Sequence, residues 1–208
     1  MFTKIKTIIL YKQHTSRRAK MDLKTYMNNL KNTIDAVSET QSDNFQNVID
    51  TFKYAQENGK NIYLFGNGGS GATASHFASD MNKGASGGSD KRFRAICLND
   101  NVALMLAISN DMSYEDVFVE QLKNFLEEGD VVLGISGSGN SKNVIKAIEY
   151  AKSNGAKTIG FCGYDGGKLK QIVDTSLHVP LNDMQISEDL HIIFVHALMR
   201  CLNPDYEC

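Results

Sequence analysis

Two short loops rich in glycine and serine carry the residue types that most plainly suggest chemistry. The first reads GNGGSG at residues 66–71, and the second reads SGSGNS at residues 136–141. Each loop follows a short apolar run and precedes a helical pattern, so backbone N–H groups and the start of a helix point at the same space. Glycine also lets the backbone approach a phosphate closely. The sequence therefore predicts two anion-binding loops.

The first loop also fits the spacing G-x-G-x-x-G, through Gly66, Gly68 and Gly71. A dinucleotide site would add an acidic residue at the end of the second strand, roughly 20 residues further on. Asp90 precedes that strand, and Asp100 follows it somewhat late. The dinucleotide interpretation is therefore weak, and it leaves the second loop unexplained. A P-loop is excluded, because neither loop contains Gly-Lys followed by Ser or Thr.

The second loop offers three hydroxyl groups, from Ser136, Ser138 and Ser141, with Gly137 and Gly139 between them. It contains no lysine or arginine. Hydroxyls, backbone amides and a helix dipole can hold one phosphate monoester without a fixed cation. The alternative is a turn that only caps the helix after it. We favour the phosphate, because the loop ends a run that reads as a buried strand.

Ionisable side chains recur at helical spacing on two further segments. His76 and Asp80 are four residues apart after the first loop, so one helix face carries both. Glu188 precedes His191 by about one turn, and His196 follows among apolar residues. A buried histidine without a partner is costly, which favours a functional role for His196. Asp80 alone could equally be a solvated acid, and we expect no role for His191 or His178.

These residues must be positioned by elements whose patterns alternate along the chain. Residues 21–58 show two helical patterns. Five apolar runs then read as buried strands, at residues 61–65, 92–98, 130–136, 157–163 and 175–181. Helical patterns fall at 101–110, 114–129, 141–155 and 187–202, with Ser187 as a candidate cap, and residues 84–90 read as a loop. This alternation predicts an α/β three-layer sandwich with a five-stranded, mostly parallel sheet and extra N-terminal helices. The ligand should lie at the carboxyl ends of the strands.

Composition limits the class of protein. The 208 residues suffice for one domain, and 42% hydrophobic and 22% charged residues are ordinary globular values. A net charge of −2 gives no reason to expect nucleic acid as a partner. No apolar run approaches the roughly 18 residues of a membrane span. The four cysteines form no C-x-x-C pair, so we expect reduced core cysteines at Cys97 and Cys162 in a cytoplasmic protein.

Residues 1–20 differ from the rest, with six Lys or Arg and no acid. Their apolar run is too short for a secretory core, and a basic segment follows it where a small-residue cleavage site would stand. We interpret residues 1–20 as a flexible N-terminal extension and residues 21–203 as a single domain.

The order of the motifs resembles the SIS (sugar isomerase) domain family. G-N-G-G-S is followed by H-F-A, then S-G-N-S, then D-G-G-K, and then H-x-x-x-x-H in the last helix. The resemblance covers about residues 21–202. It is greatest to the phosphoheptose isomerases, which convert sedoheptulose 7-phosphate to D-glycero-D-manno-heptose 7-phosphate. It implies an aldose–ketose isomerase with an enediol intermediate, assembled as a homotetramer. It also makes the G-x-G-x-x-G match a coincidence of a phosphosugar loop.

The resemblance also assigns site residues. The three loop serines would hold the phosphate, with Gly137 where heptose isomerases usually carry Thr. The remaining substrate contacts would be Asn67, Gly68, Ser70, Asp100 and Glu188.

Proton transfer between C1 and C2 needs a base, a group that returns the proton and a group that polarises the carbonyl. The resemblance gives His196 and Asp80 these proton-transfer roles. His76, Asp80, Glu188 and His196 could also bind zinc. Asp80 stands where the family has Glu, and Glu188 where it has Gln, which leaves the sugar itself open.

Two other interpretations belong to different functional classes. One is a non-catalytic SIS-domain protein that binds a phosphosugar or a replication initiator protein. That branch lacks the acid on the first helix, so Asp80 and His196 together argue against it here. The other is a sugar-phosphate-sensing domain, although such regulators usually carry a DNA-binding domain.

Overall fold

The computed structural model describes residues 21–86, 90–203 and 205. Five parallel strands form one sheet in the order β2-β1-β3-β4-β5. The strands are β1 (Asn61–Gly66), β2 (Arg94–Cys97), β3 (Val131–Ser136), β4 (Lys157–Cys162) and β5 (Thr175–His178). The predicted five-stranded sheet is confirmed, and every strand pair in it is parallel. The extension predicted at residues 1–20 lies outside the described residues.

The direction in which successive strands are added reverses beside β1. This strand pairs with β2 on one side and with β3 on the other, and β4 and β5 continue from β3. The side chains of β1 and β3 are almost all buried, as expected for central strands covered on both faces. Ligands of open α/β sheets bind at the carboxyl ends of the strands where such a reversal occurs. The loops after β1 and β3 are those that carry the glycine and serine motifs.

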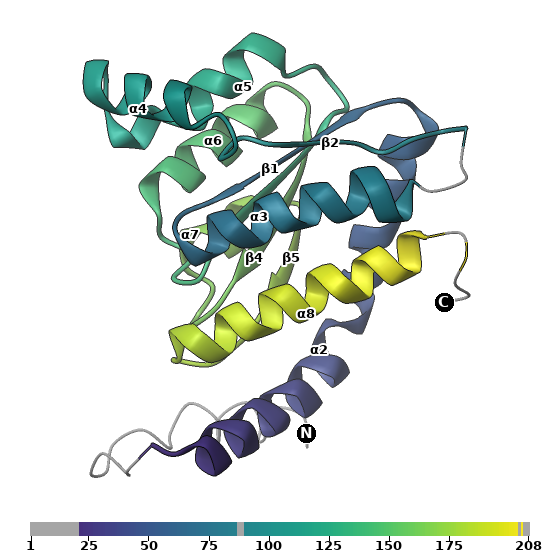
Figure 1. Ribbon diagram of the computed structural model, residues 1–208, viewed down its shortest axis with the longest axis vertical. Helices are drawn as coiled ribbons and strands as arrows, with labels where there is room; N and C mark the ends of the chain where they lie inside the picture. Colours follow the sequence, from purple (N-terminus) through teal and green to yellow (C-terminus); the bar gives the residue numbers. More distant parts are fainter. Residues whose placement is uncertain (1–20, 87–89, 204, 206–208) are drawn as a thin grey trace.

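Helices cover both faces of the sheet (Figure 1). One layer holds α2 (Leu23–Glu57), α3 (Gly69–Asp80) and α8 (Met184–Leu202), and the other holds α4 (Val102–Asp111), α5 (Val119–Phe125), α6 (Lys142–Ser153) and α7 (Gly167–Ile172). Strand side chains alternate between the two cores, with Leu64 facing the first and Tyr63 the second. The predicted three-layer sandwich is therefore confirmed.

Helix α2 is a single helix of 35 residues, although the sequence predicted two helical segments. The polar stretch between those segments contains no glycine or proline. The hydroxyls of Ser38, Thr40 and Ser42 each donate to a backbone carbonyl three or four residues earlier, at 2.7–2.9 Å. Such bonds satisfy the side chains without interrupting the helix. The side chain of Asp22 caps α2 by accepting from the Thr25 N–H at 2.8 Å.

Helix α8 begins at Met184, three residues before the candidate cap Ser187. Asp183 is the N-cap, and its carboxylate accepts from the Ile186 N–H at 3.1 Å. The Ser187 hydroxyl lies inside the helix and donates to the Asp183 carbonyl at 2.7 Å. The prediction of a Ser187 cap was wrong, because α8 begins one turn earlier and the carboxylate of Asp183 caps its first turn.

Three other elements differ from the sequence pattern. The predicted loop at 84–90 begins inside a π-helix, η1 (Met81–Ala85), and residues 87–89 of that loop are outside the described residues. The helical pattern at 114–129 is broken into a 3-10 turn, η2 (Tyr114–Asp116), and the shorter α5. The sequence analysis did not identify α7.

The structure also describes the cysteine thiols and the character of the helices. Cys97 and Cys162 are buried with free thiols, and burial raises the pKa of each to about 12. In the described part of the chain, none of the helices combines the length and apolar character that crossing a membrane requires.

Candidate active site

The two glycine- and serine-rich loops start side by side at the carboxyl edge of the sheet. Gly66 at the end of β1 pairs with Ile135 of β3, one residue before Ser136. A Cβ atom at Gly66 would lie only 2.9 Å from the Ile135 carbonyl oxygen, so glycine permits this close approach. The predicted convergence of both loops on one edge is therefore seen in the structure.

The first loop leads directly into α3. Gly68 is the N-cap, with a φ of +53°, and as a glycine it offers no capping side chain to the first turn of α3. Ser70 is buried in that turn. Asn99, which follows β2, braces the start of the loop by donating to the Gly66 carbonyl at 2.8 Å and accepting from its N–H at 3.2 Å. The loop is thus rigidly placed, and the amides at the start of α3 are available to an anion.

The serine loop has hydroxyls that are not used for helix capping. Ser141 is the N-cap of α6, but its side chain makes no capping bond. Its Oγ atom lies 2.9 Å from Oγ of Ser136, and Ser138 accepts from the Asn140 N–H at 3.2 Å. Gly139 has a φ of +66°, a conformation that favours glycine. The alternative of a simple capping turn therefore does not describe this loop.

The loop between β4 and α7 supports the serine loop from the side. Gly163 donates its N–H to the Gly137 carbonyl at 2.8 Å, and Leu169 donates to the Gly139 carbonyl at 2.9 Å. A Cβ atom at Gly139 would overlap the Gly166 carbonyl. The D-G-G-K motif at 165–168 thus packs against the backbone of the serine loop.

Three ionisable side chains meet between α3 and α8. The Nε2 atom of His76 lies 3.0 Å from Nε2 of His196 and 3.3 Å from a carboxylate oxygen of Asp80. One ligand atom from each residue lies within 4.8 Å of the other two. His76 and His196 are exposed and Asp80 is half-buried. Two imidazoles and a carboxylate are a donor set that suits zinc, so these residues fit a divalent metal.

Glu188 is not part of this three-residue cluster. Its carboxylate faces the first turn of α3, where a Cβ atom at Gly69 would lie 3.1 Å from Oε2. His196 follows eight residues later on α8, which corresponds to about 12 Å along the helix. A carboxylate at the start of a helix interacts favourably with the helix dipole. The metal-ligand role of Glu188 therefore stays a prediction, and its position beside the first loop agrees with a substrate contact.

Asp100 lies in the turn between β2 and α4 and is exposed. Its backbone N–H donates to the Cys97 carbonyl at 3.3 Å. The turn is at the same carboxyl edge as the two loops, which is compatible with the predicted substrate contact.

The two histidines without an expected role are both buried. His178 receives a hydrogen bond from Lys170 at 3.0 Å and donates to the Tyr164 carbonyl at 3.1 Å, and burial lowers its pKa. His191 packs against the rings of Phe161 and Phe194, and burial lowers its pKa to about 4.

Two residues that join the loops were not predicted from the sequence. Asn143 on α6 exchanges side-chain hydrogen bonds with Asn67 at 2.8 and 2.9 Å, and the Tyr114 hydroxyl donates to the side-chain Oδ1 of Asn67 at 2.8 Å. Asn143 is 2% exposed. A polar residue on the buried side of an amphipathic helix was the signal that could have identified it.

Comparison with known proteins identifies the family of this chain. A sequence profile described as the SIS domain matches residues 25–163. A phosphoheptose isomerase of Helicobacter pylori (strain P12) is 39% identical over 85% of this chain and 90% of its own length. A probable phosphoheptose isomerase of Thermoplasma acidophilum is 39% identical over 76% of this chain and 87% of its own length. The structure of phosphoheptose isomerase GmhA from Neisseria gonorrhoeae superimposes with a TM-score of 0.81 at 28% identity, covering 86% of this chain and 96% of that chain.

The sequence profile, the relatives and the superposition agree with one another over most of the chain. The range that the profile matches includes both loops and strands β1 to β4. The chain therefore belongs to the SIS domain family.

Proposed function

We propose that this chain is a phosphoheptose isomerase, which interconverts sedoheptulose 7-phosphate and D-glycero-D-manno-heptose 7-phosphate through an enediol. The observation that carries the proposal is the meeting of His76, Asp80 and His196 in a fold whose serine loop can bind a phosphate. Relatives named phosphoheptose isomerase at 39% identity support the same chemistry.

The distance along α3 between its start and His76 agrees with this substrate. His76 follows Gly69 by seven residues on α3, which is about 10 Å along the helix. In a heptose 7-phosphate the phosphate is at the opposite end of the carbon chain from C1 and C2. A phosphate held near the start of α3 and α6 would leave C1 and C2 free to reach Asp80 and His196, which lie beside His76.

The roles follow from the chemistry of each group. Ser136, Ser138 and Ser141 bind the phosphate through hydroxyls and the start of α6. His196 is the principal base, and Asp80 moves the second proton of the enediol. Asn67, Gly68, Ser70, Asp100 and Glu188 contact the sugar.

His76, Asp80 and His196 would hold a zinc ion. Glu188 would become the fourth ligand only if its carboxylate left the first turn of α3. A bound zinc would supply polarisation of the carbonyl.

The active form is a homotetramer in this proposal. Three apolar side chains on α2 are exposed, Leu23 at 77%, Met27 at 55% and Ile34 at 38%. Their spacing places them along one side of the helix, and such an apolar stripe indicates a protein–protein interface.

The direct test is an isomerisation assay with purified protein on a panel of ketose phosphates, with and without added zinc. Turnover of sedoheptulose 7-phosphate, and none of the unphosphorylated sugar, is the expected result. The His196→Gln variant serves as the control for contaminating isomerase. Wild-type protein that converts no ketose phosphate under either condition would refute the proposal.

A further inference from the structure

Asn67 belongs to the first loop. Its side chain lies beside α6, the helix after the serine loop, and beside η2, the turn before α5. Its side chain contacts two other side chains, Asn143 of α6 and Tyr114 of η2. Tyr114 is 54% exposed, so burial contributes little to its placement. The geometry of these three residues determines what Asn67 can offer to a ligand.

The direction of every hydrogen bond in this group is determined by one backbone N–H. The Val144 N–H donates to Oδ1 of Asn143 at 2.9 Å, and a backbone N–H can only donate. The amide orientation of Asn143 is therefore set. Its Oδ1 then accepts from Nδ2 of Asn67 at 2.9 Å, and its Nδ2 donates to Oδ1 of Asn67 at 2.8 Å. With Asn67 oriented in this way, the Tyr114 hydroxyl must be a donor.

The bonding capacity of Asn67 is then almost used up. An amide oxygen has two lone pairs, and both are occupied by Asn143 and Tyr114. An amide nitrogen has two protons, and one is given to Asn143. One N–H donor remains. Asn67 can therefore bind an acceptor oxygen of the ligand and cannot accept from a ligand hydroxyl.

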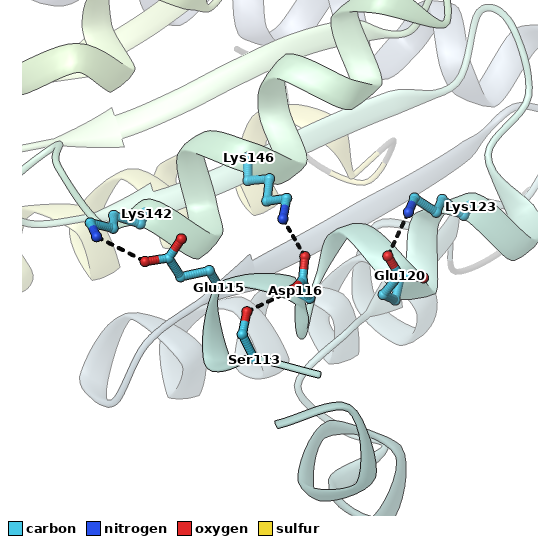
Figure 2. A network of polar contacts seen from close by, with 7 residues as sticks. All are labelled: Ser113, Glu115, Asp116, Glu120, Lys123, Lys142 and Lys146. Atoms are coloured by element: carbon cyan, nitrogen blue, oxygen red, sulfur yellow. Dashed lines mark hydrogen bonds and ion pairs between the residues drawn. The ribbon is translucent and has the colours of Figure 1, made fainter. Parts of the chain in front are cut away.

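Tyr114 is held in place from α6, the helix that also carries Asn143. Figure 2 shows Lys142 paired with Glu115 at 2.9 Å and Lys146 paired with Asp116. The Ser113 hydroxyl donates to Asp116 at 2.6 Å. Together these contacts fasten the short turn to the start of α6.

The electrostatics agree with this fastening. The hydrogen bond from Lys146 lowers the pKa of Asp116, and the hydrogen bond to Glu115 raises the pKa of Lys142. Asp116 and Lys142 therefore stay charged over the neutral pH range.

We propose that Tyr114 and Asn143 are positioning residues, which act through Asn67 by fixing its amide so that a single N–H faces an oxygen of the sugar phosphate. This inference rests on the proposed function for the identity of the ligand. Neither residue needs to touch the substrate. They determine the hydrogen-bonding character of the residue that does.

A double-mutant cycle tests this indirect action. Tyr114→Phe removes one neutral hydrogen bond and keeps the ring, and it should lower kcat/KM about 2- to 10-fold. Asn143→Asp puts a carboxylate oxygen against the side-chain Oδ1 of Asn67 and should lower kcat/KM further. In the Asn67→Ala background, neither change should have any additional effect, because the residue through which they act is gone. Tyr54→Phe, on the distant helix α2, is the matched control and should leave kcat/KM unchanged in both backgrounds.

Additive losses in the Asn67→Ala background would overturn the proposal, since they would mean direct substrate contact or a general loss of structure. The same cycle is measured on the dissociation constant for sedoheptulose 7-phosphate by calorimetry. An intact cycle in binding without any turnover would defeat the isomerase proposal and leave this one standing.

A measurement without substrate checks the geometry directly. In ¹⁵N-labelled protein, the side-chain amide resonances of Asn67 should move in Tyr114→Phe and in Asn143→Asp, and not in Tyr54→Phe. Unmoved Asn67 resonances in both variants would show that the hydrogen bonds do not form in solution, and the inference would fail.

Discussion

At the scale of single residues, the short distance between His76 and His196 has the most direct chemical consequence. Two ring nitrogens 3.0 Å apart cannot both present a lone pair to each other without repulsion. They need either a proton on one of them or a cation between them. Asp80, at 3.3 Å from His76, would supply a further ligand to such a cation.

The proton-transfer assignment predicts different outcomes for two substitutions at one position. Asp80→Asn keeps the shape but loses the group that moves the second proton, and it should lower kcat by about 10²–10⁴. Asp80→Glu keeps the carboxylate and should retain most of the activity. His196→Gln should abolish turnover while phosphate binding persists. The measurement is steady-state kinetics on sedoheptulose 7-phosphate, with bound zinc determined for each variant.

Near-normal kcat in both Asp80→Asn and His196→Gln would contradict the assignment. The Glu188→Gln variant separates metal binding from proton transfer. If Glu188 is a ligand, this variant binds zinc more weakly and keeps part of the activity.

His191 predicts how the stability of the fold depends on pH. Its pKa is about 4 in the folded protein and near 6.5 when unfolded, because burial disfavours the charged ring. Between these values the unfolded chain binds more protons, so stability decreases as pH falls from 6.5 towards 4. The effect amounts to about 3 kcal/mol at most. The neighbouring His178 lowers the pKa of His191 and the Cys162 backbone raises it.

Urea unfolding at pH 6.5 and at pH 4.5 provides the measurement. His191→Phe, which keeps an aromatic ring beside Phe161, should show a smaller loss of stability between the two pH values than the wild type. The pKa of His178 is also lowered by burial, so the variant retains part of the dependence. An equal loss in variant and wild type would exclude His191 as the source.

Residue types and spacing predicted much of the site, and the limits of that prediction have physical reasons. His76 and Asp80 could be placed on one helix face from their spacing of four residues. Their meeting with His196 depended on the family resemblance, because it requires packing between α3 and α8. Asn143 was missed because its partner Asn67 is on a different loop, and sequence spacing carries no information on such a contact.

At the scale of elements, the serine loop is the part whose function can be isolated most cleanly. Its backbone is held by Gly163 and Leu169, so removing a hydroxyl should not disturb its shape. Ser138→Ala and Ser141→Ala should each raise KM, since a hydrogen bond to a charged group contributes about 1.5–3 kcal/mol. The expected increase is about 10- to 100-fold in KM for the phosphorylated sugar, with little change in unfolding temperature.

The matched control is Ser153→Ala at the other end of α6, whose hydroxyl donates only to the Tyr150 carbonyl at 2.8 Å. Unchanged KM in both loop variants would remove the phosphate from this loop.

Element boundaries were predicted less well than element types. Five strands and most helices follow from apolar runs and helical periods. Helix α2 was read as two segments because polarity was taken as a break, whereas side-chain hydroxyls bonded to the helix backbone keep it continuous. The start of α8 was misplaced because two capping residues, Asp183 and Ser187, lie within one turn. Hydrogen-bond geometry decides between such candidates.

At the scale of the whole molecule, the exposed apolar stripe on α2 makes assembly the main prediction. Burying Leu23, Met27 and Ile34 between copies would remove from water the apolar area that the single chain leaves exposed. We expect a tetramer by light scattering at micromolar concentration. Met27→Glu should shift the protein towards smaller species, while Glu57→Gln at the far end of the helix should not. A wild-type monomer at that concentration would rule out the assembly.

The parallel sheet has a consequence for the order in which the protein folds. Val131 of β3 pairs with Lys157 of β4 across one helix, whereas Ile62 of β1 pairs with Val131 across a far longer stretch of chain. Closing the longer loop costs more chain entropy, and pairings distant in sequence form slowly. The unit β3–α6–β4 contains the whole serine loop. We therefore expect the half with the serine loop to form early, and the half with the first loop to dock onto it as the rate-limiting event of folding.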